Sequence, residues 1–322
     1  MKRFYLIIYF FLYVTMNFLI EGSVVALEGG VLVKTEPPKQ LIHLRCEVVH
    51  GLVVLDEEHV LVAVSVRGGG GIVRDQVLKI TISQDENGGY SITDEPFGAI
   101  PYKGIGGIAV SADGNVVYVC DRVAARIYEI DAKTGKLRGA IETAGMPTDV
   151  VALGDGTLWY LTSDGRLHHY LQGRRTKVIL DREAGRPVAI EGARGLAVNS
   201  VTGEVVTGRG KVVVAVDAES GEVRDIAKGF SRVIDVSGVM VNGELSLFVA
   251  DDEGVNEGGK VYIVKMDGTK REIFNDKKND AMMPRYVKSF GSQRYIAIAS
   301  VVKGGNRNGG GRVVLVIGKY GR

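Results

Sequence analysis

Residues 106–137 have the sequence GGIAVSADGNVVYVCDRVAARIYEIDAKTGKL. An apolar run is followed by a turn at Ala112–Asn115, a second run, a short loop, an alternating run and a turn at Lys133–Gly135. Asp-Gly between apolar runs favours a β-hairpin, because both residues accept the positive φ angles of tight turns. The stretch therefore predicts a meander of short antiparallel strands.

Similar meanders recur along the chain and make six units, which begin at His50, Gly106, Thr148, Arg194, Val236 and Arg285. The spacing is typical of a four-stranded propeller blade. A single meander cannot bury both of its apolar faces, whereas units stacked around an axis can. We therefore predict an all-β fold, a six-bladed β-propeller over residues 27–322, behind a separate segment at residues 1–26.

The last unit contains only three strands before the chain ends at Arg322. We expect an N-terminal strand to supply the missing outer strand and so close the last blade. Either Gly30–Lys34 or Gln40–Arg45 can do this, because each is a short apolar run before the first unit. Closure of this kind removes an exposed sheet edge.

The second unit also resembles a known family. GIAVSADGNVVYVCD at residues 107–121, followed by RIYEID at residues 126–131, resembles the NHL and YVTN β-propeller repeats. It is also similar to the senescence-marker/gluconolactonase and strictosidine-synthase-like propellers. The resemblance implies the fold, but not one activity, because these propellers include enzymes, sugar-binding modules and interaction platforms.

Charge and cysteine content restrict the classes of function. The chain has 40 basic and 38 acidic residues, and this balance argues against a nucleic-acid partner held through many phosphates. Its two cysteines, Cys46 and Cys120, are too few for a disulfide framework. They are either one bridge or two buried free thiols. We expect a monomer.

The N-terminus has the features of a secretory signal. Lys2 and Arg3 precede an apolar run from Phe4 to Ile20, and small residues near Ala26 fit cleavage there. The run is also long enough for an uncleaved signal anchor, which would then be the only membrane contact. Either alternative predicts a folded part that is secreted, extracellular or in a secretory lumen.

Blade geometry places two sets of loops on opposite faces. The turns from first to second and from third to fourth strand are tight, for example Gly154–Gly156 and Glu219–Gly221. The other loops are irregular, notably residues 67–71, 251–257 and 303–308 in units one, five and six. We expect a binding site on the irregular face near these units, because scaffolded loops often carry function. The alternative is that they are flexible glycine-rich connections.

The residues just before the innermost strands should point into the central channel. With the neighbouring alternatives Asp149 and Tyr286, they are His50, Gly106, Thr148, Arg194, Ser237 and Arg285. The gluconolactonase resemblance implies a channel metal held by Glu, Asn and Asp, but here Gly106 and Arg194 replace such ligands and only Asp149 is a carboxylate. Arginine and histidine instead suit an anion, which arginine can bind bidentately. Alternatively, the arginines pair with Asp149 or with a neighbouring carboxylate.

A weaker acidic candidate follows the second strand of the fifth unit. Asp251, Asp252 and Asn256 offer the oxygen ligands that Ca²⁺ prefers. No EF-hand spacing is present, and Asp side chains also cap turns. No other cofactor is expected. His168 and His169 are adjacent in a strand, so they point to opposite faces and cannot share a metal, and Trp159 indicates packing between blades.

These features favour a binding module over an enzyme. We expect the propeller to bind a protein, a glycan or a small anionic ligand on its irregular face. The alternatives are a gluconolactonase/strictosidine-synthase-like hydrolase with a degenerate metal site, or a propeller that has lost its ligand.

Overall fold

The computed structural model describes residues 18–20, 23–28, 31–34, 44–56, 58–67, 73–84, 90–171, 177–180, 185–241, 244–254, 258–275, 282–290, 295–302 and 312–319, with side chains only between residues 48 and 275. The regular elements in these ranges are β-strands. None of these residues forms a helix that could span a bilayer.

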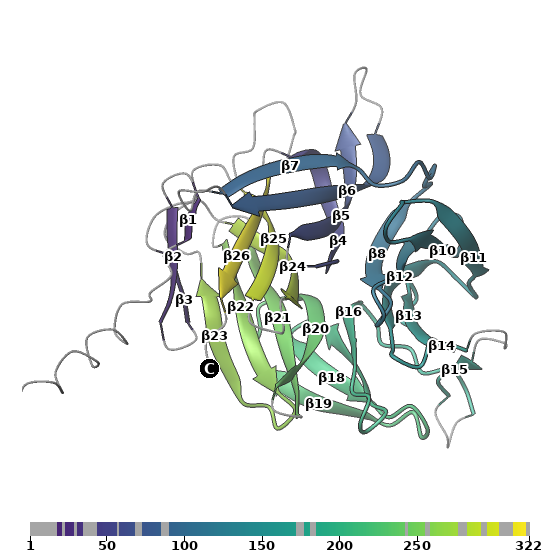
Figure 1. The fold of residues 1–322 in the computed structure, drawn as a ribbon. Helices are drawn as coiled ribbons and strands as arrows, with labels where there is room; N and C mark the ends of the chain where they lie inside the picture. Colours follow the sequence, from purple (N-terminus) through teal and green to yellow (C-terminus); the bar gives the residue numbers. More distant parts are fainter. Residues whose placement is uncertain are drawn as a thin grey trace, which may run out of the picture.

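Four sheets each contain four consecutive antiparallel strands (Figure 1). The first is β8 (Ile105–Val110), β9 (Val116–Asp121), β10 (Arg126–Asp131) and β11 (Leu137–Glu142). The second is β12 (Pro147–Ala152), β13 (Leu158–Thr162), β14 (Leu167–Tyr170) and β15 (Lys177–Val178). The third is β16 (Ala193–Val198), β17 (Val205–Arg209), β18 (Val212–Val216) and β19 (Val223–Lys228). The fourth is β20 (Val233–Val241), β21 (Glu244–Gly254), β22 (Gly258–Lys265) and β23 (Lys270–Asn275).

A fifth four-stranded unit belongs to a larger sheet. It consists of β4 (Leu44–Val54), β5 (His59–Arg67), β6 (Val73–Gln84) and β7 (Tyr90–Pro96). Three further strands, β24 (Met282–Phe290), β25 (Tyr295–Val302) and β26 (Arg312–Lys319), join it to make a seven-stranded sheet. The junction is the pairing of β26 with β4, in which Arg312 lies opposite Arg45 and Val313 opposite Leu44.

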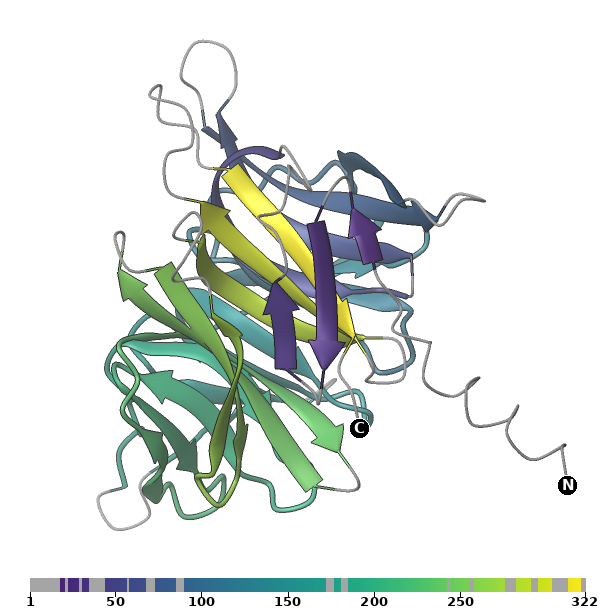
Figure 2. The ribbon, with the colours of Figure 1, turned by 90° about the vertical axis from the view of Figure 1, so that its left-hand side faces the viewer.

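The N-terminal strands pack outside these units. β1 (Phe18–Ile20), β2 (Ser23–Glu28) and β3 (Val31–Lys34) form a small sheet of their own. Figure 2 shows them on the outer side of the molecule, where β2 contacts β26 and β3 contacts β23. Of the two segments expected to pair with the last unit, the second therefore does so through Leu44 and Arg45. Residues 40–43 lie outside the described ranges.

The innermost strands lie side by side around the centre of the molecule (Figure 1). β4 contacts β8, β8 contacts β12, β12 contacts β16, β16 contacts β20, and β24 contacts both β20 and β4. Apolar clusters fill the spaces between neighbouring units. One cluster joins Leu61 and Ala63 of β5 to Ile105 of β8 and Val117 of β9. Each meander thus buries its faces against the next, and the fold is an all-β propeller.

Three innermost strands begin earlier than the sequence predicted. β4, β20 and β24 begin at Leu44, Val233 and Met282, before the expected starts at His50, Val236 and Arg285. In β4 the extra residues have a partner outside their own unit, because its first residues pair with β26. His50 and Ser237 therefore lie inside strands and not before them.

Cys120 is a free thiol, fully buried in β9. Burial raises its pKa well above the ordinary value. The alternative of a buried free thiol therefore holds for Cys120; the side chain of Cys46 lies outside the described part.

Candidate functional site

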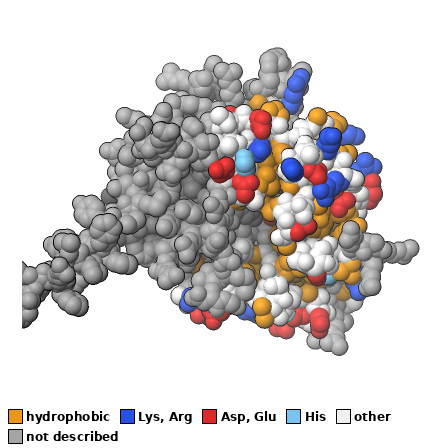
Figure 3. Space-filling model, viewed as in Figure 1, with side chains coloured by type: hydrophobic (Ala, Val, Ile, Leu, Met, Phe, Trp, Pro, Cys, Tyr) orange, Lys and Arg blue, Asp and Glu red, His pale blue; other side chains and the backbone are white. Residues whose placement is uncertain are grey.

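A cavity of about 590 Å³ lies among the innermost strands of the first five units. Its walls come from β4, β8, β12, β16 and β20, from Leu161 of β13, and from the loops that follow β9 and β13. Those loops join second to third strands, so the cavity opens on the face where irregular loops were expected. Figure 3 shows a histidine and charged side chains of both signs near the centre of this face. The lining residues include His50, Gly106, Arg122, Thr148, Asp149 and Arg194.

Most of the channel residues expected from the sequence meet here. His50, Thr148, Asp149 and Arg194 all line the cavity, although each lies within its strand and not before it. Ser237 is buried in β20, opposite Phe248 of β21, and is not part of the lining.

Two other groups of candidates fall outside the described part. Arg285 and Tyr286 belong to β24, whose side chains are not described. Most residues of the irregular loops at 67–71 and 303–308 lie outside the ranges too, as do residues 255–257.

The guanidinium groups of the two cavity arginines have no partner among the described residues. The side chains of Arg122 and Arg194 make no hydrogen bond or ion pair there. The Nε atom of Arg122 is buried without a partner. Asp149, the carboxylate on the cavity wall, accepts the N–H of Val150 at 2.9 Å through Oδ1. Arg194 therefore does not pair with Asp149 among the described residues. The same pairing for Arg285 stays a prediction, because the side chains of β24 are not described.

His50 is held as a neutral imidazole at the cavity wall. Its Nε2 lies 2.8 Å from Oγ of Ser65, which donates to Oδ1 of Asp75 at 2.6 Å. Because Ser65 uses its proton on Asp75, Nε2 must carry the hydrogen and Nδ1 keeps its lone pair. Burial, and then the charge of Arg122, lowers the pKa of His50 from 6.5 to about 4.

Asp75 also connects the first unit to the second. Its other carboxylate oxygen, Oδ2, accepts the backbone N–H of Ile105 at 2.8 Å. Ile105 begins β8, the innermost strand of the next unit. The chain of bonds from His50 to Asp75 therefore fixes both the imidazole and the strand that forms the next part of the wall.

The metal ligands that the gluconolactonase resemblance implies do not fit this cavity. A hard divalent cation needs several oxygen ligands, whereas this lining carries one carboxylate and two guanidinium groups. β8 also has no room for an additional ligand, because a Cβ on Gly107 would lie 2.2 Å from Oδ1 of Asp149. In the described ranges no group of three or more His, Cys, Asp or Glu side chains could hold a metal ion.

The acidic residues near the end of β21 bind to Ser231 and Arg232, which precede β20. Oδ1 of Asp251 accepts the backbone N–H groups of Ser231 at 2.9 Å and Arg232 at 2.7 Å, and Asp252 pairs with the guanidinium of Arg232. Asp121, at the end of β9, accepts the backbone N–H of Lys103 in the same way at 2.8 Å. Asp251 thus caps backbone N–H groups, while Asp252 makes an ion pair and Asn256 lies outside the described part, so the Ca²⁺ candidate stays a prediction.

Arg122 is a cavity residue that was not expected from the sequence. The expected channel residues lie next to innermost strands, whereas Arg122 follows the end of β9. A signal was present, because the end of a second strand and the start of a first strand lie on the same face of a blade. An arginine directly after the second strand can therefore reach the channel mouth.

Comparisons with known proteins identify the fold. No family model matches the sequence, and no curated protein matches it. A chain of a nidogen–laminin complex shares 14% identity with a TM-score of 0.55, over 75% of this chain and 94% of that one. Luciferin-regenerating enzyme shares 12% identity with a TM-score of 0.58, over 86% of this chain and 94% of the enzyme chain. The WD40 β-propeller domain of Doa1 shares 11% identity with a TM-score of 0.52, over 84% of this chain and 82% of the Doa1 chain. At these identities the likeness shows a β-propeller fold alone.

Proposed function

We propose that this protein is a six-bladed β-propeller that binds a small anionic ligand in its channel cavity. Three observations support a ring of six. Innermost strands contact one another from β4 round to β24 and back to β4. β24–β26 supply three strands of a sixth unit, and the start of β4 pairs with β26 where an outer strand is missing.

The observation that carries the ligand class is the pair of unpartnered guanidinium groups. Among the described residues, Arg122 and Arg194 line the cavity with one carboxylate, Asp149, so positive charge prevails in this part of the lining. A buried guanidinium nitrogen without a hydrogen bond is unfavourable, and a carboxylate or phosphate would satisfy it bidentately. Neutral His50 adds an acceptor at Nδ1, and Thr148 adds a hydroxyl. Their presence favours a ligand that carries hydroxyl groups besides its anionic group.

Isothermal titration calorimetry with small carboxylates and phosphate tests this function. We expect Arg194→Gln and Arg122→Gln each to weaken binding about tenfold or more, because a charge-assisted hydrogen bond contributes about 1.5–3 kcal/mol. Arg138→Gln is the matched control, since Arg138 pairs with Asp131 on the surface. Equal affinity in all three variants would contradict the proposal.

The hydrolase alternative makes a different prediction for metal content. A hydrolase of this kind would use a metal ion in the channel. Elemental analysis of the purified protein therefore distinguishes the hydrolase from the anion-binding protein. We expect less than stoichiometric Ca²⁺ and Zn²⁺. One equivalent of either that is lost in the Asp149→Asn variant would overturn the anion site.

The N-terminal segment completes the proposal. We propose that residues 1–26 direct the propeller to the exterior or to a secretory lumen, either as a cleaved signal or as an anchor. The basic start and the apolar run from Phe4 to Ile20 support this. Cleavage after Ala26 would remove β1 and divide β2, which belong to the small separate sheet. Mass spectrometry of the protein from its native host would find a mature N-terminus at Leu27 if the signal is cleaved. Cytosolic protein that keeps Met1 would contradict both alternatives.

A further inference from the structure

The six innermost strands each contain a β-bulge, an additional residue without a partner on the second strand. In β4, Val49 lies opposite Val64 and Gly51 opposite Ala63, so His50 is the additional residue. A bulge bends the strand and turns a side chain in a new direction, and bulges are frequent next to functional sites. The additional residues are His50 in β4, Gly106 or Gly107 in β8, Thr148 in β12, Gly195 or Leu196 in β16, Ile234 in β20 and Arg285 in β24.

These bulges form the wall of the channel cavity. In each of the first five units a bulge residue lines it, and these residues are His50, Gly106, Thr148, Gly195 and Ile234. The bulges therefore explain why residues within strands, and not before them, reach the channel. His50 and Thr148 are the bulge residues of this set that bring polar side chains to the cavity.

One nitrogen of His50 is left for a ligand. Nε2 donates its hydrogen to Oγ of Ser65 at 2.8 Å, because the Ser65 hydroxyl donates to Asp75 at 2.6 Å. Nδ1 therefore carries a lone pair and no hydrogen. It makes no hydrogen bond with a described residue, yet it is not buried, so a ligand in the cavity can reach it.

Thr148 also acts as an acceptor toward the cavity. Its hydroxyl donates to the carbonyl oxygen of Leu161 at 3.2 Å, so the lone pairs of Oγ1 remain. The cavity thus combines two acceptors with the guanidinium groups of Arg122 and Arg194. A carboxylate satisfies the guanidinium groups but offers no hydrogen to an acceptor. A ligand with an O–H group beside its carboxylate satisfies both kinds of group.

An apolar surface adjoins the open nitrogen. Val48, two residues before His50 in β4, also lines the cavity and is 45% exposed. Burial of this side chain against a ligand would be favourable. This part of the lining therefore suits a short alkyl group and not a chain of many hydroxyls.

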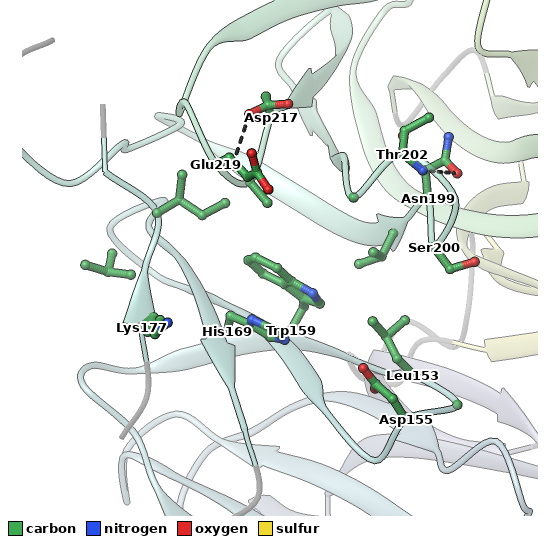
Figure 4. A pocket seen from close by; sticks show the side chains of 16 residues that line it. Leu153, Asp155, Trp159, His169, Lys177, Asn199, Ser200, Thr202, Asp217 and Glu219 are labelled. Carbon is green, nitrogen blue, oxygen red and sulfur yellow. Dashed lines mark hydrogen bonds between the residues drawn. The ribbon is translucent and has the colours of Figure 1, made fainter. Parts of the chain in front are cut away.

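A larger cavity, of about 940 Å³, lies between the unit β12–β15 and the unit β16–β19 (Figure 4). It exists because β15 contains two residues, whereas β11, β19 and β23 contain six each. Oδ1 of Asp155 on its rim accepts from Thr157 at 2.6 Å, and Oδ1 of Asp217 accepts the N–H of Ser220 at 2.6 Å. These two aspartates thus stabilise their own turns, unlike the open nitrogen of His50.

Stacked rings form the floor of this larger cavity. Trp159 of β13 and His169 of β14 have parallel rings with centroids 4.3 Å apart. His168 points to the opposite face and stacks on Tyr160, as the alternation of the strand predicted. Trp159 packs against apolar residues of the next unit such as Leu196, which confirms its predicted place between blades.

We propose that His50 makes the channel selective for short hydroxycarboxylates. The carboxylate would bind the guanidinium groups of Arg122 and Arg194, and the hydroxyl would donate to Nδ1 of His50. This inference rests on the proposed anion site and adds the kind of anion and the residue that selects it. Ser65 and Asp75 are positioning residues, because they hold the imidazole in the tautomer whose Nδ1 accepts.

Three matched acids test the selectivity by isothermal titration calorimetry of the full-length protein at neutral pH. Lactate and propionate differ only in the hydroxyl, and 2-methoxypropionate keeps the oxygen but has no hydrogen to donate. We expect lactate to bind about five- to tenfold more tightly than propionate, the contribution of one hydrogen bond. We expect 2-methoxypropionate to bind no more tightly than propionate.

Variants assign the selectivity to His50. The measured quantity is the ratio of the lactate to the propionate affinity, whatever the change in each affinity. We expect this ratio to fall to about one in His50→Phe, which lacks the acceptor, and to fall in part in Ser65→Ala, which frees the tautomer. His59→Gln is the control and should keep the wild-type ratio, since His59 pairs with Asp56 at the surface.

The imidazole ¹⁵N chemical shifts of protein labelled at histidine give a second readout. The signals of His50 are those that disappear in His50→Phe. We expect a protonated Nε2 and an unprotonated Nδ1 in the wild type, and a mixture of tautomers in Ser65→Ala. A merely structural role of Ser65 would not change the tautomer.

Equal affinity for lactate and propionate in the wild type would overturn this inference and leave the anion site in place. Binding of neither acid would overturn the anion site and this inference with it. An unchanged ratio in His50→Phe, or a protonated Nδ1 in the wild type, would show that His50 does not recognise the hydroxyl.

Discussion

Arg122 and Arg194 differ from most other arginines of the described part in having no acidic partner. The arginines that pair with an acidic residue are Arg126, Arg138, Arg166, Arg209, Arg224 and Arg232. Surface pairs of this kind contribute little to stability. The contrast matters for function, because the cavity contains two guanidinium groups without partners in the described part, and the Nε atom of one of them, Arg122, is buried.

The neutral state of His50 predicts a pH dependence of stability. Its pKa in the folded protein is about 4, below the ordinary 6.5. Between these values the unfolded chain binds the proton more tightly, so the free energy of unfolding falls as the pH falls from 6.5 to 4. The loss amounts to at most about 3 kcal/mol, at roughly 1.4 kcal/mol per pKa unit.

Guanidinium chloride unfolding at pH values of about 7.5 and 4.5 measures this effect in the wild type and in His50→Gln. Glutamine keeps an N–H donor for Ser65 but does not titrate. We expect the variant to lose less stability on acidification than the wild type. Identical losses would show that His50 does not carry the dependence.

Single residues were predictable only where their place in the repeat determined them. Thr148 and Arg194 stand near the starts of innermost strands, so the repeat alone places them at the channel. The partners of His50 were not predictable, because Ser65 and Asp75 meet it only through the register of β4, β5 and β6. Arg122 required the loop after a second strand to be considered as well.

At the scale of strands, the innermost strands pack so closely that side chains are excluded at some positions. Gly195 in β16 has a φ of +70°, and a Cβ there would lie 2.0 Å from the backbone nitrogen of Val236 in β20. Both the left-handed backbone and the contact between neighbouring blades therefore require glycine.

We expect Gly195→Ala to lower the free energy of unfolding by about 3 kcal/mol or more, since the change combines backbone strain with overpacking. Gly203→Ala is the control, because Gly203 has a φ of +77° in a turn with no atom within 4 Å of its Cβ. Strain alone should reduce its stability by about 1 kcal/mol. Chemical denaturation of both variants gives the comparison, and equal losses would contradict the close approach of β16 and β20.

The strand order was predictable, whereas the cavity between blades was not. Asp-Gly turns and apolar alternation place each hairpin, as at Asp113-Gly114 and Asp267-Gly268. β15 contains only two residues, and residues 172–176 before it lie outside the described part. The resulting hollow depends on side-chain volumes across two units, such as those of Trp159 and Val198, and no local pattern encodes these.

At the scale of the whole molecule, the repeat predicts a ring, and the ring brings distant residues together. His50, Arg122, Thr148 and Arg194 come from four units of the sequence and line one cavity because their strands share an axis. From the sequence we expected the site nearer units five, six and one. The described cavity is lined by units one to five, and the side chains of unit six are not described, so this expectation stays a prediction.

A crystal structure of the protein grown in sodium malonate tests the central claim most directly. We expect six blades around one axis, β26 paired with the start of β4, and a malonate bound between the guanidinium groups of Arg122 and Arg194. A different number of blades, or both arginines paired with protein carboxylates and no malonate in the channel, would contradict the account.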